Sequence, residues 1–393
     1  MNRMLCFDVS KEWVIHIPRG MPVAKQVAED ISHYLEVLRN QAGLSLKPPG
    51  IKDSPTNSPD YLAPQIRLCI EGNSREQTGF FWRIEKDRIE ISGESDRGLC
   101  NGVFDFLGAL GFRWPEPGKE ILPPVNTVKP QEYIPQERAR YHPSTEDTIR
   151  RRLFFQRRHP TAAWKPLIIW AVRNQIDILV FSLYVRVLSG RKKEAPSHPW
   201  IRFGRKMLWH GRYSRREAVF NLAEQYALTI ERGGWDLSLL VPRWYFGLNR
   251  EIFRMDSGKR DWKYNFCPTA PDTIKLIRRE AEKLFRTYPE TLVYHLWPDR
   301  NHERAWCACP TCRAFSLDEQ VRIAVTVAAD VLMQINPRGL ISYYERFSGN
   351  RGIALRPNLL KMSRLPGEAG AEAEGWFSET SFKGNETAPL KRS

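Results

Sequence analysis

The sequence predicts an α/β protein with a small N-terminal α/β domain over residues 1–125 and a partial (β/α) TIM-like barrel over residues 137–364. Two observations carry this prediction. Before residue 125, short runs suited to strands surround stretches with helical spacing, and two of the runs form a hairpin pattern. After residue 136, apolar runs of strand length alternate with amphipathic stretches, which is typical of βα units in a parallel sheet.

The composition is that of a folded protein with a basic surface. The 393 residues are enough for two or more domains, and 42% of them are hydrophobic and 11% aromatic. There are 60 Lys and Arg residues against 45 Asp and Glu residues, and the excess is concentrated between Arg138 and Arg216. This region indicates either a nucleic-acid surface or a solvated basic face. We favour the solvated face, because the common nucleic-acid-binding motifs are missing from the sequence.

No stretch of about 18 residues is apolar enough to cross a membrane as a helix. The start, MNRMLCFDVSKEWVIHI, lacks the apolar core and the small-residue cleavage site of a signal peptide. We therefore expect a cytoplasmic protein with no membrane partner, or an exported protein if the true N-terminus is missing.

The elements of the N-terminal domain follow from their spacing. Apolar residues from Ala24 to Leu38 recur at helical spacing, and two alternating runs flank Lys86-Asp87 as in a hairpin. Gly98 and Gly102 lie one turn apart in a second helix, which allows close packing on a sheet. In order, we expect strand 13–17, the first helix, loop 43–64, strands 65–70, 80–84 and 88–91, and helix 97–107.

A linker rich in Pro and Gln at residues 126–136 separates the two parts. In the second part we expect strands near residues 139–142, 176–182, 237–241, 292–297, 340–344 and 358–362, with helices at 214–230, 272–288 and 316–335. These make about five or six βα units, whereas a closed barrel needs eight. Residues 365–393 are poor in apolar side chains and predict a disordered tail.

Residues 292–312 combine a buried strand, a carboxylate and a cysteine cluster. Side chains alternate along a strand, which directs His295 and Trp297 to the barrel interior. Asp299 continues this set and belongs at the mouth of the barrel, where active-site groups gather. It is a candidate catalytic residue; alternatively, it is a loop Asp that pairs with a neighbouring arginine such as Arg300.

Glu345 is the candidate catalytic partner of Asp299, because it lies just past the next strand. Glycoside hydrolysis commonly uses two carboxyl groups, about 5–5.5 Å apart for retention or about 6.5–9.5 Å apart for inversion. Adjacent strands lie about 4.8 Å apart, which allows such a separation. Alternatively, Glu345 is a surface residue that pairs with Arg346 or Arg351.

Arg243, Trp244 and Tyr245 directly follow a predicted strand and therefore belong at the same mouth. The rings can stack on a sugar, and Arg243 can bind the carboxylate of an acidic sugar; the alternative is a loop that plugs the barrel top. His295 and Trp297 are further candidates for substrate binding, although His295 is more simply a core histidine.

Cys307, Cys309 and Cys312 form a C-x-C-x-x-C cluster, and three thiolates need one more ligand to complete a tetrahedral zinc site. Cys267 and His302 are the candidates for that ligand. A closed site would be structural, so we expect a structural zinc at most and no cofactor for catalysis. The alternatives are unmetallated thiols or, in an oxidising compartment, a disulfide.

Two groups of motifs resemble known families. One resembles the N-terminal domain that precedes the barrel in alpha-glucuronidases and beta-hexosaminidases; its residues are Arg97-Gly98, Gly102-Val103, Phe106-Leu107 and Gly111-Phe112-Arg113-Trp114. The other resembles an uncharacterised alpha-glucuronidase-like family, the domain of unknown function numbered 4838, through Phe266-Cys267-Pro268, Leu296-Trp297-Pro298-Asp299 and residues 306–312. The resemblance covers about residues 12–363. It implies that the last barrel strands of that family are absent here.

The resemblance implies a glycoside hydrolase-like protein with alpha-glucuronidase-like specificity, whose partner is a carbohydrate. One alternative is a truncated, non-catalytic carbohydrate-binding remnant, and a less favoured one is a nucleic-acid-binding protein. The sequence contains no P-loop, G-x-G-x-x-G or G-x-S-x-G motif, so it does not indicate nucleotide binding or α/β-hydrolase chemistry by those routes.

Overall fold

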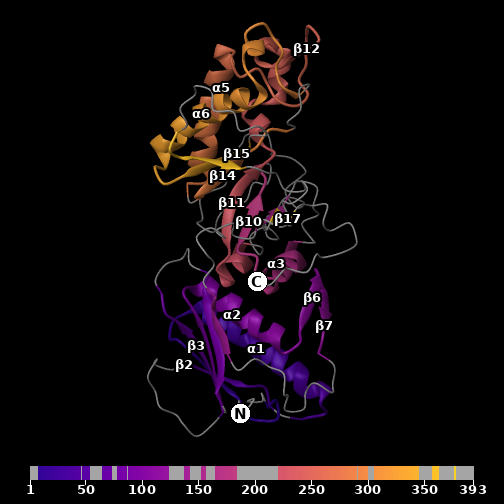
Figure 1. Cartoon of the computed structure of the whole chain (residues 1–393), viewed down its shortest axis with the longest axis vertical. Coiled ribbons are helices and arrows are strands. Elements are labelled where there is room, and N and C mark those ends of the chain that lie inside the picture. The colour runs from indigo at the N-terminus through magenta and orange to yellow at the C-terminus, as the bar shows by residue number, and fades with distance from the viewer. Residues whose placement is uncertain are drawn as a thin grey trace, which may run out of the picture.

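The computed structural model describes residues 8–45, 47–53, 64–72, 78–85, 87–123, 137–141, 152–155, 164–183, 220–289, 291–299, 305–344, 356–362 and 376–377. Figure 1 shows an elongated molecule with the N-terminal domain at one end and the last long helices towards the other. Within these residues, no helix combines the length and the apolar character needed to span a bilayer.

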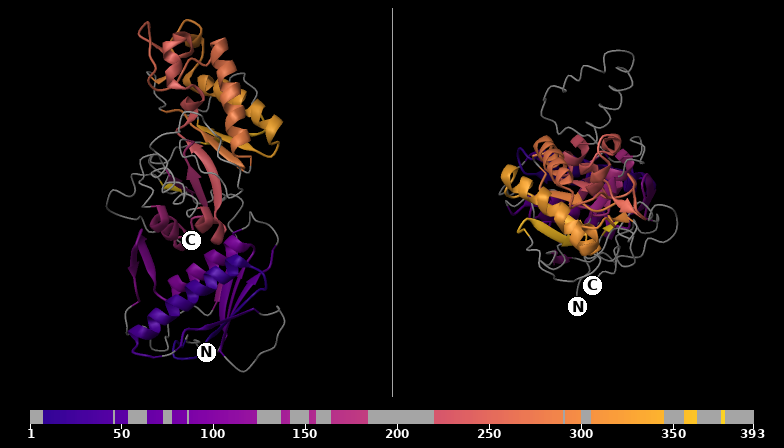
Figure 2. Two further views of the ribbon diagram at one scale, coloured as in Figure 1. Left: turned by 180° about the vertical axis from the view of Figure 1, so that it is seen from behind. Right: turned by 90° about the horizontal axis from the view of Figure 1, so that it is seen from above.

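The N-terminal domain is a six-stranded sheet with two helices packed on it. The strands are β1 (Val14–Ile17), β2 (Gly50–Asp53), β3 (Gln65–Ile70), β4 (Phe80–Glu85), β5 (Arg88–Gly93) and β8 (Glu137–Tyr141), and the helices are α1 (Pro22–Gln41) and α2 (Asp96–Ala109). The order is β2-β1-β3-β5-β4-β8, parallel as far as β5 and antiparallel at β4 and β8. Both helices cross the sheet (Figure 2). Their apolar sides are buried. A separate hairpin joins β6 (Arg113–Glu116) to β7 (Lys119–Ile121).

Helix α2 packs close to the sheet because glycines remove side chains at the contact. A Cβ atom on Gly98 would lie 2.3 Å from the carbonyl oxygen of Gly79, and one on Gly102 would lie 3.1 Å from the Ile91 side chain. The helix begins after Ser95, whose hydroxyl accepts a hydrogen bond from the Gly98 N–H at 3.1 Å. The predicted role of the two glycines is confirmed.

The second part is a parallel sheet with helices packed on it. The strands are β9 (Arg152–Phe155), β10 (Ile178–Phe181), β11 (Thr229–Gly234), β14 (Val293–Leu296), β15 (Leu340–Tyr344), β16 (Leu359–Met362) and β17 (Trp376–Phe377), and the helices are α3 (Trp164–Arg173), α5 (Pro271–Thr287) and α6 (Leu317–Ile335). From β9 to β16 the strands of this sheet pair in chain order, as in a barrel wall, and β17 pairs with the other edge of β9. The predicted α/β fold is thereby confirmed.

The strands of this sheet separate an inner set of side chains from a set that packs with the helices. Val180, Trp297 and Tyr344 belong to one small buried cluster. Tyr294 and Leu296 belong to a different, larger cluster that also contains the apolar sides of α5 and α6. The alternation predicted for residues 292–297 is confirmed for these side chains.

Two strands expected in the barrel are placed differently. The strand expected at residues 139–142 is β8, which pairs antiparallel with β4 in the N-terminal sheet, so the parallel sheet begins with β9. The strand expected at residues 237–241 is instead the 3-10 helix η3 (Leu237–Leu240). The strand in this part of the chain is β11, which ends at Gly234. Its apolar pattern is interrupted by Glu231 and Arg232. Of the tail predicted at residues 365–393, only β17 is among the described residues.

A buried ion pair joins α2 of the N-terminal domain to the start of β10. Arg97 donates to Asp177 Oδ1 from Nε and to the Ile176 carbonyl from Nη2, both at 3.0 Å. Asn101, one turn further along the helix, donates to the same Asp177 oxygen at 3.0 Å. Around these groups one apolar cluster runs from α1 and α2 to α3 and β10. The junction is therefore a packed core around a buried, hydrogen-bonded ion pair.

Replacement of Arg97 by Ala should destabilise the protein by about 3–5 kcal/mol, because the Asp177 carboxylate stays buried without its cation. Arg83→Ala is the matched control. Arg83 pairs with Glu90 at the surface of the same domain, and such pairs contribute less than about 1 kcal/mol. Urea denaturation of the three proteins measures the difference. Equal unfolding free energies for the two variants would contradict the assignment.

Candidate active site

The carboxyl ends of β10, β11 and β14 meet at one edge of the parallel sheet. The pairing of β11 and β14 extends past the strands, since the Trp297 N–H donates to the Gly234 carbonyl at 2.8 Å and the Leu237 N–H donates to the Trp297 carbonyl at 3.0 Å. This extension brings two acidic residues to the same edge. Asp236 follows β11, and Asp299 follows β14.

Asp236 is a buried carboxyl group held by the end of β10. It accepts hydrogen bonds from the Leu183 N–H at 2.8 Å and from the Ser182 hydroxyl at 3.2 Å. Burial raises the pKa of Asp236 to about 6, and the negative charge of Asp299 adds to this effect while the two hydrogen bonds oppose it. Asp236 was not recognised from the sequence. The strand expected at residues 237–241 placed it before a strand, whereas candidate site residues were sought after strands.

Asp299 is a partly exposed carboxylate paired with Arg243. Arg243 Nη2 donates to Asp299 Oδ2 at 2.8 Å, and the Asp299 N–H donates to Asn265 Oδ1 at 3.0 Å. The same guanidinium also donates to the carbonyl oxygens of Trp262 and Tyr264. Arg243 thus fixes the loop around Asp299 and is already engaged by protein groups. Its predicted contact with an acidic sugar stays a prediction.

His295 lies in a buried hydrogen-bond network beneath these carboxylates. Its Nε2 is 2.7 Å from Glu231 Oε2, and its Nδ1 is 2.6 Å from the hydroxyl oxygen of Ser342. Trp297 Nε1 donates to the same hydroxyl at 3.0 Å. Glu231 and Ser342 were not singled out from the sequence, and Glu231 lies in a strand that the sequence did not predict. The network orients the Trp297 ring within the interior cluster.

The aromatic residues after η3 form an exposed surface beside Arg243. Trp244 and Tyr245 lie in the 3-10 helix η4 (Arg243–Gly247), and their rings stack with centroids 3.9 Å apart. The Trp244 side chain is 64% exposed and Trp262 is 49% exposed. The Tyr245 hydroxyl accepts a hydrogen bond from Arg279 of α5 at 2.6 Å, which fixes the inner ring of the stack.

Glu345 and His302 lie outside the described residues. The predicted pairing of Glu345 with Asp299 therefore stays a prediction. Among the described residues, Asp236 is a carboxyl group that lies close enough to Asp299 for the two charges to interact.

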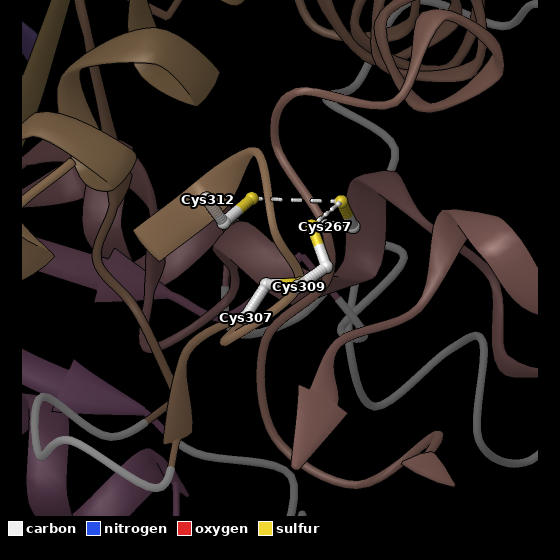
Figure 3. Close-up of side chains that lie close together, drawn as sticks. All are labelled: Cys267, Cys307, Cys309 and Cys312. Atoms are coloured by element: carbon white, nitrogen blue, oxygen red, sulfur yellow. Dashed lines mark hydrogen bonds between the residues drawn. The ribbon is translucent and has the colours of Figure 1, made fainter. Parts of the chain in front are cut away.

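The four predicted cysteines meet in one buried cluster (Figure 3). The sulfur atoms of Cys267, Cys307, Cys309 and Cys312 all lie within 4.8 Å of one another. Cys267 precedes α5, whereas the other three lie between β14 and α6. The spacing of the three neighbours was visible in the sequence. Only the fold shows that Cys267 joins them.

The cysteine cluster is hydrogen-bonded internally and by a short hairpin of β12 (Met255–Asp256) and β13 (Lys259–Arg260). The Met255 N–H donates to Cys307 Sγ at 3.3 Å. Hydrogen bonds from the Cys307 and Cys312 thiols lower the pKa of Cys267. The same sharing with Cys267 raises the pKa of Cys307 to about 11. Four soft ligands of this kind suit a zinc or iron ion.

No family model and no curated protein matches the chain. Solved structures do match it. A chitobiase from Flavobacterium johnsoniae aligns with a TM-score of 0.50 at 14% identity, over 88% of this chain and 50% of its own. A GH20 beta-N-acetylhexosaminidase from Streptomyces coelicolor A3(2) gives 0.49 at 11% identity, over 91% of this chain and 66% of its own. A GH20 exo beta-N-acetylglucosaminidase from Vibrio harveyi, an inactive mutant, gives 0.49 at 14% identity, over 95% and 57%.

These likenesses concern the fold. The chain spans half to about two thirds of the length of the three structures. The chitobiase alignment supports a fold of the type found in a glycoside hydrolase family, as the resemblance implied. Membership of the family numbered 4838 stays a prediction.

The raised pKa of Asp236 predicts a pH-dependent contribution to stability. This contribution is fully present below the unfolded-state pKa of about 3.8 and is lost as the pH rises through about 6. The rise in the pKa of Asp236 from 3.8 to about 6 corresponds to about 3 kcal/mol. Between pH 4 and pH 7, the wild-type protein should therefore lose about this much stability relative to Asp236→Asn, as measured by urea denaturation. A constant difference between the two proteins would refute the raised pKa.

Proposed function

We propose that the chain is a carbohydrate-active protein of the glycoside hydrolase type, with its site at the carboxyl ends of β10, β11 and β14. The observation that carries the proposal is the pair of neighbouring carboxyl groups in opposite surroundings. Asp236 is buried and has a raised pKa, whereas Asp299 is partly exposed and bonded to a guanidinium. Carboxyl pairs with separated environments supply the acid and the base of glycoside hydrolysis.

Each carboxyl suits one role. Burial favours the protonated form of Asp236, so this residue would protonate the oxygen of the departing sugar. Asp299 is bonded to the Arg243 guanidinium, and its carboxylate would attack the sugar carbon or activate a water molecule. The position of both residues at strand ends of a barrel-type sheet agrees with this assignment.

The exposed rings beside Arg243 suit a sugar-binding surface. Trp244 and Tyr245 are already stacked, and Arg279 holds the Tyr245 hydroxyl, so Trp244 presents an ordered outer face. The apolar face of a pyranose ring can cover such an indole, and the polar edge of the sugar then points to neighbouring hydrogen-bonding groups. Trp262 is a further exposed aromatic residue, and its carbonyl oxygen accepts from Arg243.

The substrate is best sought among both amino-sugar and uronic-acid glycosides. The chitobiase with the TM-score of 0.50 is a precedent for amino sugars on this fold, and the motif resemblance favours uronic acids. The engagement of Arg243 by Asp299 and two carbonyl groups weighs against Arg243 as the receptor of a uronate carboxylate. That specificity would then need another cation.

A sugar-binding protein without hydrolytic activity is the second candidate. The observation that favours it is the burial of Asp236, because a general acid must contact the glycosidic oxygen. Under this alternative, the Arg243–Asp299 pair would bind sugar hydroxyl groups and the aromatic surface would supply most of the affinity.

Asp236→Asn and Asp299→Asn should each slow sugar release by about 10²–10⁴-fold, which is the range for removing a general acid or base. The measurement is product release from a panel of aryl hexosaminides and glucuronides. Asp330→Asn is the control, since Asp330 pairs with Arg356 at the surface of α6. Release by neither the wild-type protein nor any variant would exclude hydrolysis and leave the binding alternative. Full activity of both site variants would exclude these two residues.

Trp244→Ala should weaken glycan binding about five-fold, because loss of one stacking face is worth about 1 kcal/mol. Calorimetric titration with the same glycans measures this change. Met333→Ala removes another exposed apolar side chain, on α6, and should leave the affinity unchanged. Equal affinities of all three proteins would show that the aromatic surface does not bind sugar.

A further inference from the structure

We propose that Cys267, Cys307, Cys309 and Cys312 bind one zinc ion, and that this ion holds the loop that carries Asp299. The first support is the geometry of the sulfur atoms. Cys267 Sγ lies 3.9 Å from Cys309 Sγ and 3.6 Å from Cys312 Sγ, and all four sulfurs fall within 4.8 Å of one another. A tetrahedral site with Zn–S bonds of about 2.3 Å has sulfurs about 3.8 Å apart. Bonded sulfurs of a disulfide are only about 2.05 Å apart.

The second support is the set of donors around the sulfurs. The Met255 N–H donates to Cys307 Sγ at 3.3 Å, and Arg260 Nη1 lies 3.7 Å from the same sulfur. The Thr269 hydroxyl lies 3.1 Å from Cys312 Sγ. Four thiolates around Zn²⁺ leave an excess of two negative charges, which N–H and O–H donors and a half-buried guanidinium stabilise. Donors turned towards sulfur suit thiolates better than neutral thiols.

The site is closed, which assigns it a structural role. All four sulfur ligands come from buried residues, and they fill the four positions of a tetrahedral ion. The chelate joins two segments that are distant in the sequence, one before α5 and one between β14 and α6. Zinc binding would therefore contribute its free energy to the ordering of both segments.

Asn265 connects this chelate to Asp299. It lies two residues before Cys267, and its side-chain amide donates to the carbonyl of Ala305, two residues before Cys307, at 3.1 Å. The Asn265 side-chain oxygen accepts the Asp299 N–H at 3.0 Å. The neighbouring Tyr264 carbonyl accepts from Arg243, the cation of Asp299. Asn265, which accepts the Asp299 backbone N–H, and Arg243, which donates to the Asp299 carboxylate, are thus both fixed by residues close to the proposed metal ligands.

Metal analysis of the full chain tests the site directly. Protein purified under reducing conditions, without added metal or chelator, should contain about one equivalent of zinc by plasma mass spectrometry. Cys267→Ser and Cys312→Ser should lose it, whereas Cys69→Ser, a cysteine of β3 outside the cluster, should retain it. A wild-type protein with no stoichiometric metal, or with iron in place of zinc, would overturn the assignment. The metal content of the wild-type protein does not depend on whether the variants fold.

Hydrogen exchange of the wild-type protein tests the link to Asp299. Zinc is removed with a mercurial reagent and a chelator, and amide exchange is compared before and after. Residues 252–270 and 293–315 should lose protection, including the Asp299 amide, while the sheet of β1, β3 and β5 should keep it. Unchanged protection around Asp299 would overturn the positioning role. Neither measurement needs a glycan, so failure of the proposed sugar chemistry would leave both readouts intact.

Discussion

The register between β11 and β14 is the constraint on which the candidate site depends. Gly233 lies opposite His295, and a Cβ atom on Gly233 would lie 2.0 Å from the His295 carbonyl oxygen. Gly233 also has a φ of +110°, which side chains rarely tolerate. Only glycine permits this approach of the two backbones. The same register sets Glu231 against His295 inside the sheet and carries Asp236 and Asp299 to one edge.

The contrast between the two carboxyl groups follows from what surrounds each one. Asp236 is buried, which favours its neutral form, while the Ser182 hydroxyl and the Leu183 N–H that donate to it oppose this effect. Asp299 meets the Arg243 guanidinium and is partly exposed to solvent. The Arg243 contacts make this contrast dependent on the loop at residues 262–265, and the cysteine cluster anchors that loop. The two carboxyl groups and the cysteine cluster that supports their surroundings are therefore separate but adjacent.

The sequence predicted the elements whose signal is local. The apolar strands β10, β14 and β15 and the helices α5 and α6 were found close to their observed bounds. The position of Asp299 after a strand and the grouping of three cysteines were also predicted from spacing. The strand β11 was missed because a buried Arg232 and Glu231 break its pattern. Tertiary contacts offset the cost of burying these two polar side chains. The Arg232 guanidinium lies 4.2 Å from the Tyr288 ring centre, and Glu231 bonds to His295. Asp236 could not be found, since its raised pKa arises from burial that only the fold creates.

A crystal structure of the full chain with a bound glycan tests the central claim most directly. The account predicts that the glycosidic oxygen lies within hydrogen-bond reach, about 2.6–3.2 Å, of the Asp236 carboxyl, with the Asp299 carboxylate on the other side of the sugar carbon. A glycan bound away from both carboxyl groups, with Asp236 still enclosed by Ser182 and Leu183, would contradict it.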